Sequence, residues 1–251
     1  MTASRIFWLI VCGGAGAAAL VWIGWWKSGK GEREIPAGLR YAVPADCRQM
    51  VVVQPDAIVG VSAQVYLLER IRDLAPWKIV AGPLPAVVGK KGVAWGMGEP
   101  GLPNPGVYPD KNEGDGRSPA GIFRLSGAFG TSPQAPPGVK LPWLECTPTL
   151  RGVDDVKSKY YNRIVDEDTI PDKDWDSAEI MRRDDGAYEM GVLIDHNAGR
   201  RAGAGSCIFL HLWKGPDQGT AGCTALARED ILKILTWLDP AMKPRLALGV
   251  R

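Results

Sequence analysis

The sequence has almost no net charge, only two histidines and no spacing typical of a metal site. Its 30 Lys and Arg residues are balanced by 28 Asp and Glu residues, for a net charge of +2. No basic stripe with interleaved aromatic residues occurs, so we expect no nucleic-acid partner. No C-x-x-C or H-x-x-x-H spacing occurs, and we therefore expect no metal and no cofactor. Internal repeats and low-complexity tracts are also lacking, which argues against a repeat architecture.

Cysteine is scarce as well, with five residues in the chain. Cys12 lies in an apolar N-terminal segment, and Cys223 must be a free thiol if it is catalytic. Cys47, Cys146 and Cys207 remain, and they admit at most one disulfide. The sequence does not choose among the three pairings, so the count is compatible with an oxidising compartment without requiring one.

The first 26 residues contain the one long hydrophobic run. Residues 6–26 carry no charge, a length sufficient to cross a membrane as a helix. A cleaved signal peptide is the main alternative, because residues 17–19 resemble a small-residue cleavage site. The run continues past that site, which favours a retained anchor. We therefore expect a signal anchor or signal peptide over residues 1–28, a linker over 29–47 and one folded domain over 48–251.

The composition of the folded part favours short strands and loops, since the chain contains 31 glycines and 20 prolines. The residue pattern predicts a mostly β domain with few helices. It predicts helices over 63–73 and 227–238 and a turn at 82–85. It predicts a long irregular segment over 146–175. The predicted strands are 49–54, 77–80, 86–89, 122–125, 188–194 and 206–213.

The stretch 206–226 carries the strongest signal for chemistry. His211 lies late in a predicted strand, and Cys223 follows twelve residues later in a Gly-Thr-Ala-Gly-Cys setting. A connection this short can return the thiol to the imidazole, and such a pair would lower the pKa of the cysteine. The backbone N–H groups of Gly222 and Cys223 are candidates for an oxyanion hole. We therefore predict a cysteine acyl-transfer site.

Three other interpretations use the same residues. Cys207, His211 and Cys223, with His196, could ligate zinc, although their spacing does not support it. Cys207 could be the nucleophile, but in mid-strand it lacks a glycine-shaped loop. His211 and Cys223 could also be ordinary core residues, a histidine at a strand end and a small apolar side chain.

At this point the residues resemble a known family. His211 followed by Gly219-Thr-Ala-Gly-Cys223 is similar to the signature of the YkuD-type L,D-transpeptidases, and residues 113–121 resemble their Gly-rich upstream turn. The resemblance implies a β-rich, sandwich-like catalytic fold that acts on exported peptidoglycan. It implies that Cys223 attacks the diaminopimelate carbonyl of a stem tetrapeptide. D-Ala would leave, and an amine would resolve the thioester. His211 would serve as the base and proton donor.

The resemblance also has departures. Ala221 stands where the family often has His, and Ala225 stands where it commonly has an Arg for a substrate carboxylate. Either Arg117 or Arg163 could replace that cation. Hydrolysis by a carboxypeptidase or amidase, or binding of peptidoglycan without catalysis, therefore stays open.

Further residues are candidates for contacts with the substrate. Thr220 belongs to the cysteine loop, and the irregular segment supplies Tyr160, Tyr161 and Asn162 for a cleft, with Asp154 or Asp155 to meet an amine. His196, in an Asp-His-Asn turn, could orient His211, although a turn with a polar cap is the simpler interpretation. We expect the protein at the periplasmic side of the inner membrane, anchored through residues 6–26, or in the periplasm if that segment is cleaved.

Overall fold

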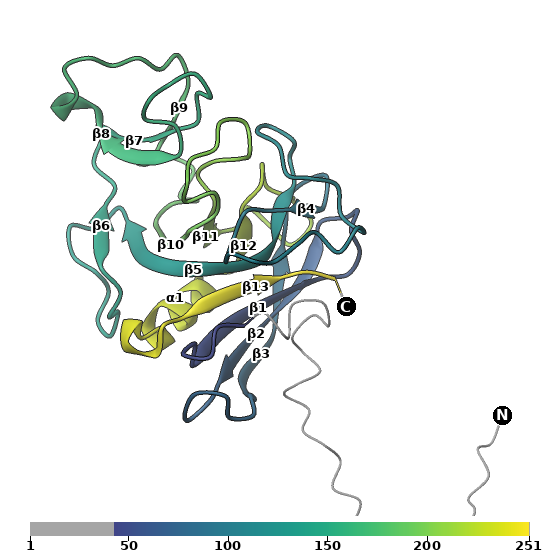
Figure 1. The fold of residues 1–251 in the computed structure, drawn as a ribbon. Helices are drawn as coiled ribbons and strands as arrows, with labels where there is room; N and C mark the ends of the chain where they lie inside the picture. The colour runs from purple at the N-terminus through teal and green to yellow at the C-terminus, as the bar shows by residue number, and fades with distance from the viewer. Residues whose placement is uncertain (1–42, 251) are drawn as a thin grey trace, which may run out of the picture.

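The computed structural model describes residues 43–250, which form a mostly β domain with one α-helix in that range (Figure 1). The predicted membrane or signal segment and most of the predicted linker lie outside the described residues. Between residues 43 and 250, no helix is long and apolar enough to cross a membrane. The elements are β1 (Gln49–Pro55), β2 (Ser62–Glu69), β3 (Lys78–Val87), β4 (Val93–Trp95), β5 (Ser118–Gly130), β6 (Trp143–Glu145), β7 (Leu150–Val153), β8 (Arg163–Asp166), β9 (Ala178–Ile180), β10 (Met190–Ile194), β11 (Phe209–Leu212), β12 (Thr224–Leu226), α1 (Arg228–Trp237) and β13 (Arg245–Leu248), with short 3-10 turns at Glu167–Thr169 and Pro240–Met242.

Eight of the strands close into a mixed β-barrel. They follow the order β10-β11-β12-β3-β2-β1-β13-β5, and β5 pairs with β10 to complete the ring. Strand β5 can do this because it is long: residues 121–124 pair with β13, and residues 125–130 pair with β10. The expected sandwich-like arrangement is therefore corrected to a closed barrel, which removes the sheet edges that a sandwich would leave.

The core fills the barrel and extends beneath α1. Alternate residues of β2 and β5 point inward, and α1 adds Ile231, Ile234 and Leu235, which are fully buried. Burial of one such side chain contributes about 1.5–3 kcal/mol. The helix packs against β10 and β11, so it braces the strand that carries His211 and its neighbour. The predicted helix over 227–238 is confirmed, as are the predicted strands over 49–54 and 188–194, although the latter begins at Met190.

The predicted helix over 63–73 is wrong, because residues 63–69 belong to strand β2 and residues 70–73 are neither helix nor strand. Helical spacing depended on Ile71 and on Leu74, yet these side chains are 80% and 77% exposed. Ala63, Val65 and Leu67 are buried on one face, as the alternation of a strand requires, and Leu68 is buried on the opposite face. The sequence supports both periods over this short window, and pairing with β1 and β3 decides between them.

Three other boundaries also differ from prediction. One strand, β3, runs through the turn predicted at 82–85. Strand β11 is limited to Phe209–Leu212, so Cys207 precedes it, with a backbone φ of 52°. The segment 146–175 is not irregular throughout, because β7 and β8 lie in it and pair with β9 as a separate three-stranded sheet.

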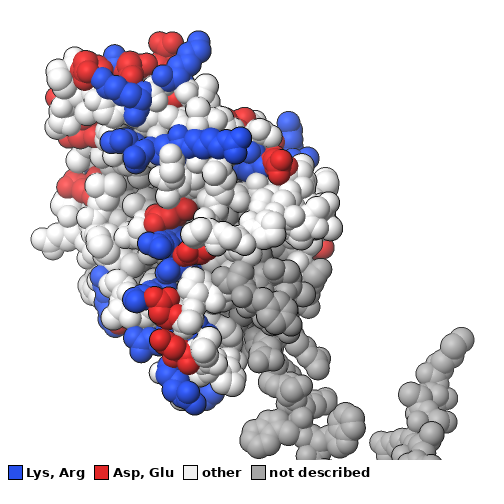
Figure 2. All heavy atoms as spheres, in the orientation of Figure 1, with Lys and Arg blue, Asp and Glu red and all other residues white. Residues whose placement is uncertain are grey.

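This small sheet and its loops form a lobe beside the barrel, defined here as residues 146–189. It lies at the upper left in Figure 1. Figure 2 shows both acidic and basic side chains over it. In the sequence the lobe lies between β6 and β10, and its last residue directly precedes β10. The lobe therefore joins the barrel beside β11, because β10 pairs with β11.

Candidate active site

Cys223 lies immediately before β12, on a loop that the barrel holds beside β11. The two strands are parallel, with Leu210 level with Thr224, so Cys223 falls beside Phe209. The Phe209 N–H donates to Cys223 Sγ at 3.3 Å, and the thiol points to the Cys207 carbonyl at 3.5 Å. Only 7% of Cys223 is exposed. Strand pairing thus positions the thiol in a nearly closed site.

Hydroxyl groups hold the cysteine loop in place. The Cys223 carbonyl accepts from Thr220 Oγ1 at 2.6 Å and from Ser118 Oγ at 2.9 Å. Ser118 also accepts from the Gly89 N–H at 2.9 Å. The Lys90 N–H donates to the Thr220 carbonyl at 2.8 Å. The Gly-rich turn before β5 therefore contributes Ser118 as an anchor for the cysteine loop.

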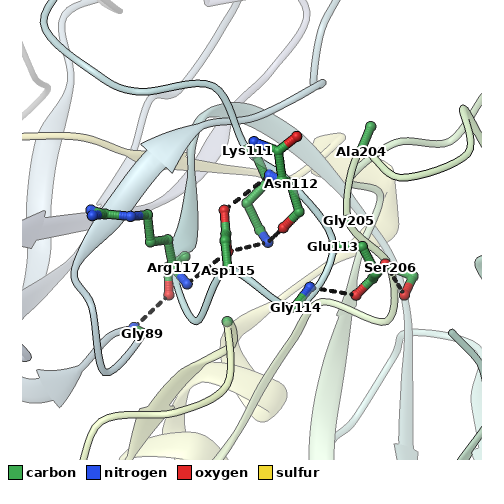
Figure 3. A network of polar contacts seen from close by, with 12 residues as sticks. Gly89, Lys111, Asn112, Glu113, Gly114, Asp115, Arg117, Ala204, Gly205 and Ser206 are labelled. Carbon is green, nitrogen blue, oxygen red and sulfur yellow. Dashed lines mark hydrogen bonds and ion pairs between the residues drawn. The ribbon is translucent and has the colours of Figure 1, made fainter.

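Asp115 organises that turn. Its carboxylate accepts from Lys111 Nζ at 2.7 Å and from the backbone N–H groups of Asn112 and Arg117, each at 2.9 Å (Figure 3). The side chain of Lys111 is almost fully buried, so this ion pair is shielded from water. Gly116 has a φ of 69°, a conformation that glycine adopts without strain. The Asp-Gly-Arg pattern is thus a rigid support for Ser118.

His211 lies in the middle of the barrel wall, opposite Gly191 of β10 and Ala225 of β12. Its Nδ1 lies 2.8 Å from the Leu212 carbonyl oxygen, which can only accept, so Nδ1 carries the proton. The neutral ring then has an unprotonated Nε2 that can accept one. Burial lowers the pKa of His211 to about 4, although the Leu212 carbonyl opposes that shift. His211 is therefore neutral at pH 7.

The thiol is also neutral at pH 7. Burial raises the pKa of Cys223 to about 12, and the nearby Glu179 carboxylate acts in the same direction. The Phe209 N–H opposes this rise, because it stabilises the thiolate. The predicted lowering of the cysteine pKa is therefore wrong for this arrangement. Across residues 43–250 no hydrogen bond joins Cys223 to His211, so no thiolate–imidazolium pair is present.

A cavity of about 340 Å³ nevertheless contains both residues in its wall. The sequence pattern does not single out four of its charged and aromatic members, which are Glu179, Arg183, Tyr188 and Lys214. Lys214 comes two residues after the end of β11, whereas Glu179, Arg183 and Tyr188 precede β10 in the sequence. The position of these three residues in the cavity wall depends on how the lobe folds against the barrel. The full lining is Glu179, Arg183, Ala187, Tyr188, His211, Leu212, Trp213, Lys214, Gln218, Gly219, Thr220, Ala221, Cys223 and Ala225.

The two cations of the cavity share one carboxylate. Arg183 Nε and Nη2 contact the Asp185 carboxylate at 2.9 and 2.6 Å, and Lys214 Nζ lies 3.0 Å from it. Arg183 also lies over the Tyr188 ring, 5.2 Å from its centre. Two positive charges against one Asp185 leave an excess of one at this rim. Ala225, where a cation was expected from the resemblance, is fully buried between β11 and β3.

Of the predicted substrate contacts, Thr220 alone lines this cavity. The Arg117 guanidinium instead donates to the Val93 carbonyl at 3.4 Å. Tyr160 packs on Trp175 at the lobe surface, with ring centres 5.5 Å apart. Arg163 begins β8 and is exposed, and it is not part of the cavity wall either.

Tyr161 and Asn162 connect the lobe to the barrel. The Tyr161 hydroxyl donates to Glu113 Oε2 at 2.5 Å, and the same carboxylate oxygen accepts from Ser206 Oγ at 2.7 Å (Figure 3). Asn162 donates to the His196 carbonyl at 3.0 Å and accepts from the Cys207 N–H at 3.0 Å. These contacts hold the chain just before β11 in place, so Tyr161 and Asn162 support the strand that carries His211 without lining the cavity.

The predicted oxyanion donors are also in the cysteine loop, but one is already engaged. The Gly222 N–H donates to Thr220 Oγ1 at 3.1 Å. An oxyanion at this position would have to replace that hydroxyl as the acceptor. The role of Gly222 and Cys223 as oxyanion donors stays a prediction.

The alternative nucleophile and the zinc interpretation find no matching geometry. Cys207 is buried against Gly152, and burial raises its pKa well above the usual value. His196 donates through Nε2 to the Ala204 carbonyl at 2.9 Å and lies away from the cavity. Among residues 43–250, no three His, Cys, Asp or Glu side chains are grouped to hold a metal. The four cysteines in that range, including Cys47 and Cys146, are free thiols.

The fold and the site together define a β-barrel domain with a buried cysteine and a neutral histidine in the wall of one cavity. The family model of the YkuD L,D-transpeptidase catalytic domain matches residues 56–244, and the chain belongs to this family. No curated protein and no solved structure matches. Membership implies an L,D-transpeptidase-type activity on peptidoglycan, with stem peptides as the substrates.

Proposed function

We propose that the protein is a peptidoglycan L,D-transpeptidase in which Cys223 attacks the diaminopimelate carbonyl of a stem tetrapeptide. The observation that carries the proposal is the shared cavity of Cys223 and His211 in a domain of this family. The substrate class comes from the family, and the roles of the two residues come from their chemistry. An exported location follows from such a substrate and is part of the proposal.

The neutral state of His211 sets the direction of proton transfer. His211 Nε2 takes the Sγ proton as the sulfur–carbon bond forms, and it then gives that proton to the departing D-Ala nitrogen as the carbon–nitrogen bond breaks. The acceptor amine attacks the thioester, loses its proton to Nε2 and displaces the thiolate, which regains the proton. The Phe209 N–H stabilises the thiolate in both halves.

The cations at the rim supply a second argument. A stem peptide ends in carboxylates, and a charge-assisted contact to a carboxylate is among the stronger hydrogen bonds. Arg183 and Lys214, which share the single carboxylate of Asp185, provide an excess positive charge at the rim of the cavity, and the family's Arg is replaced by the buried Ala225. We assign carboxylate binding to these two residues in place of Arg117 or Arg163.

Incubation of the purified protein with tetrapeptide-bearing sacculi tests the proposal. Muropeptide profiling by mass spectrometry should find 3–3 cross-links and free D-Ala, both absent with Cys223→Ala. Tripeptides without cross-links would identify a carboxypeptidase, and free stem peptides an amidase. Binding of muropeptides with no product of any kind would contradict the enzyme and support a peptidoglycan-binding module.

A further inference from the structure

Glu179 is a charged residue of the cavity that the proposed mechanism does not use. It lies in β9, at the edge of the lobe sheet that faces the barrel, and it lines the cavity together with Cys223. Its Oε2 accepts from the Tyr188 hydroxyl at 2.7 Å. Tyr188 in turn contacts the His211 ring edge-on, 5.2 Å between centres. The lobe therefore brings a carboxylate next to the thiol and the imidazole.

Glu179 is partly buried. Burial raises the pKa of Glu179, and only the Tyr188 hydroxyl and the charge of Arg183 oppose that shift. Asp154 lies close enough to act on Glu179 in the same direction as burial. Its own Oδ1 is buried and has no hydrogen-bond partner within residues 43–250. A buried acceptor without a donor is costly, so the surroundings of Glu179 hold a second acidic side chain whose need for a donor is unmet, although Asp154 itself does not line the cavity.

The cavity therefore has two poles of opposite charge. Glu179 forms the negative pole on the lobe side, and Arg183 with Lys214 forms the positive pole at the rim, where Asp185 neutralises one of the two charges. A ligand that fills the cavity expels water, so the ligand itself must supply a group of opposite charge to each pole. A zwitterionic group, with an ammonium beside a carboxylate, matches both poles.

We propose that Glu179 receives the ammonium group at the side-chain end of the acyl donor's reacting residue, while Arg183 and Lys214 receive the carboxylate beside it. The inference rests on the proposed function and deepens it, because it makes Glu179 a specificity-determining residue. An ammonium offers three donors to the carboxylate, and the contact is charge-assisted. The preferred donor then carries a free amino-acid group on the side chain of the reacting residue.

Two tetrapeptide donors that differ at their third residue isolate the ammonium. One carries lysine, which has the ammonium without the carboxylate, and the other carries norleucine, which has neither. The readout is kcat/KM for D-Ala release by wild type, by Glu179→Gln and by the control Glu189→Gln. Gln at 179 keeps an oxygen for the Tyr188 hydroxyl, and thermal unfolding checks that each variant is folded. Glu189 pairs with Arg228 at the surface and lies outside the cavity.

Wild type and Glu189→Gln should prefer the lysine donor by about ten- to a hundredfold, the range of a hydrogen bond to a charged group. Glu179→Gln should lose that preference through a fall with the lysine donor alone. An equal fall with both donors, or a preference that survives in Glu179→Gln, would overturn the assignment. The affinities of the lysine and norleucine peptides for Cys223→Ala protein give the same comparison without turnover. If the Cys223→Ala protein binds the lysine peptide more tightly but wild type releases no D-Ala, the role of Glu179 in binding the ammonium stands and the proposed reaction is rejected.

Discussion

Cys223 and His211 are both uncharged because burial acts on each of them against its charged form. Burial raises the pKa of the thiol to about 12 and lowers the pKa of the imidazole to about 4. Proton transfer from Sγ to Nε2 must therefore accompany attack on the substrate, since no thiolate exists beforehand.

Alkylation of Cys223 by iodoacetamide tests the neutral state of the thiol. With a pKa near 12, the thiolate fraction rises about tenfold for each pH unit between 7 and 9. The alkylation rate at Cys223, followed by peptide mapping, should rise in the same way without a plateau. A rate that is already constant near pH 7 would show a preformed thiolate–imidazolium pair instead.

The Thr220 hydroxyl should matter for catalysis more than for folding. It donates to the Cys223 carbonyl and accepts from the Gly222 N–H, so it sets the conformation of the cysteine loop. Thr220→Val should lower kcat by roughly tenfold, the equivalent of a hydrogen bond of about 1.4 kcal/mol, with a small change in Tm. Thr236→Val serves as the control, because Thr236 bonds only to the backbone of α1. Equal kcat values for the two variants would contradict this role.

The sequence could locate Cys223, His211 and Thr220, because a short loop between strands restricts where they lie. It could not locate Glu179 or Arg183, since nothing local to these residues differs from an ordinary surface. Their place in the cavity follows from the pairing of β9 with β7 and from the way the lobe meets β10. The irregular segment predicts Tyr161 and Asn162 as residues of a substrate cleft. In the structure their side-chain polar atoms instead form hydrogen bonds with Glu113 and with the His196 carbonyl.

At the scale of the elements, β10 and β11 must approach closely for His211 to reach the cavity. Gly191 of β10 lies opposite His211. A Cβ at Gly191 would lie 2.4 Å from Phe129 Cζ and 2.5 Å from the Leu210 carbonyl oxygen. Both contacts are shorter than atoms tolerate, so the strand pair or the Phe129 ring must shift.

Gly191→Ala should therefore lower the free energy of unfolding by about 1–3 kcal/mol, the usual cost of overpacking. Urea denaturation measures the change, and kcat should fall with it because β11 carries His211. Gly199→Ala is the matched control, since its Cβ would meet no atom within 4 Å and its cost should stay within about 0.5 kcal/mol. Similar stabilities for the two variants would argue against close packing at β10.

The elements themselves could be predicted where one period dominates. The amphipathic helix α1 has such a pattern, and β10 is recognisable instead as a short, almost continuously buried apolar run. Strand β2 fits two periods over its short length, and tertiary pairing chooses between them. Barrel closure was not predictable, because it depends on a single long strand, β5, that pairs with β13 along one half and with β10 along the other.

For the whole molecule, the two buried histidines make the free energy of unfolding decrease in mild acid. Burial lowers the pKa of His196 and of His211 to about 4, from the ordinary value of 6.5. The unfolded chain then binds more protons than the folded protein between pH 6.5 and 4, so stability is lost as pH falls through that window. By pH 5 each histidine should cost about 2 kcal/mol, measured by urea denaturation at pH 7 and pH 5. A free energy of unfolding that is equal at the two values would contradict the burial of both rings.

Cys223 as the nucleophile is the central assignment for this protein, and one measurement tests it directly. Carbapenems acylate the cysteine of this type of enzyme, so intact mass after incubation should show one covalent adduct per chain, mapped to Cys223. The other three thiols between residues 43 and 250 are buried in the core and should stay unmodified. The adduct should disappear in Cys223→Ala. No adduct on the wild-type protein, or one that persists in Cys223→Ala, would contradict the account.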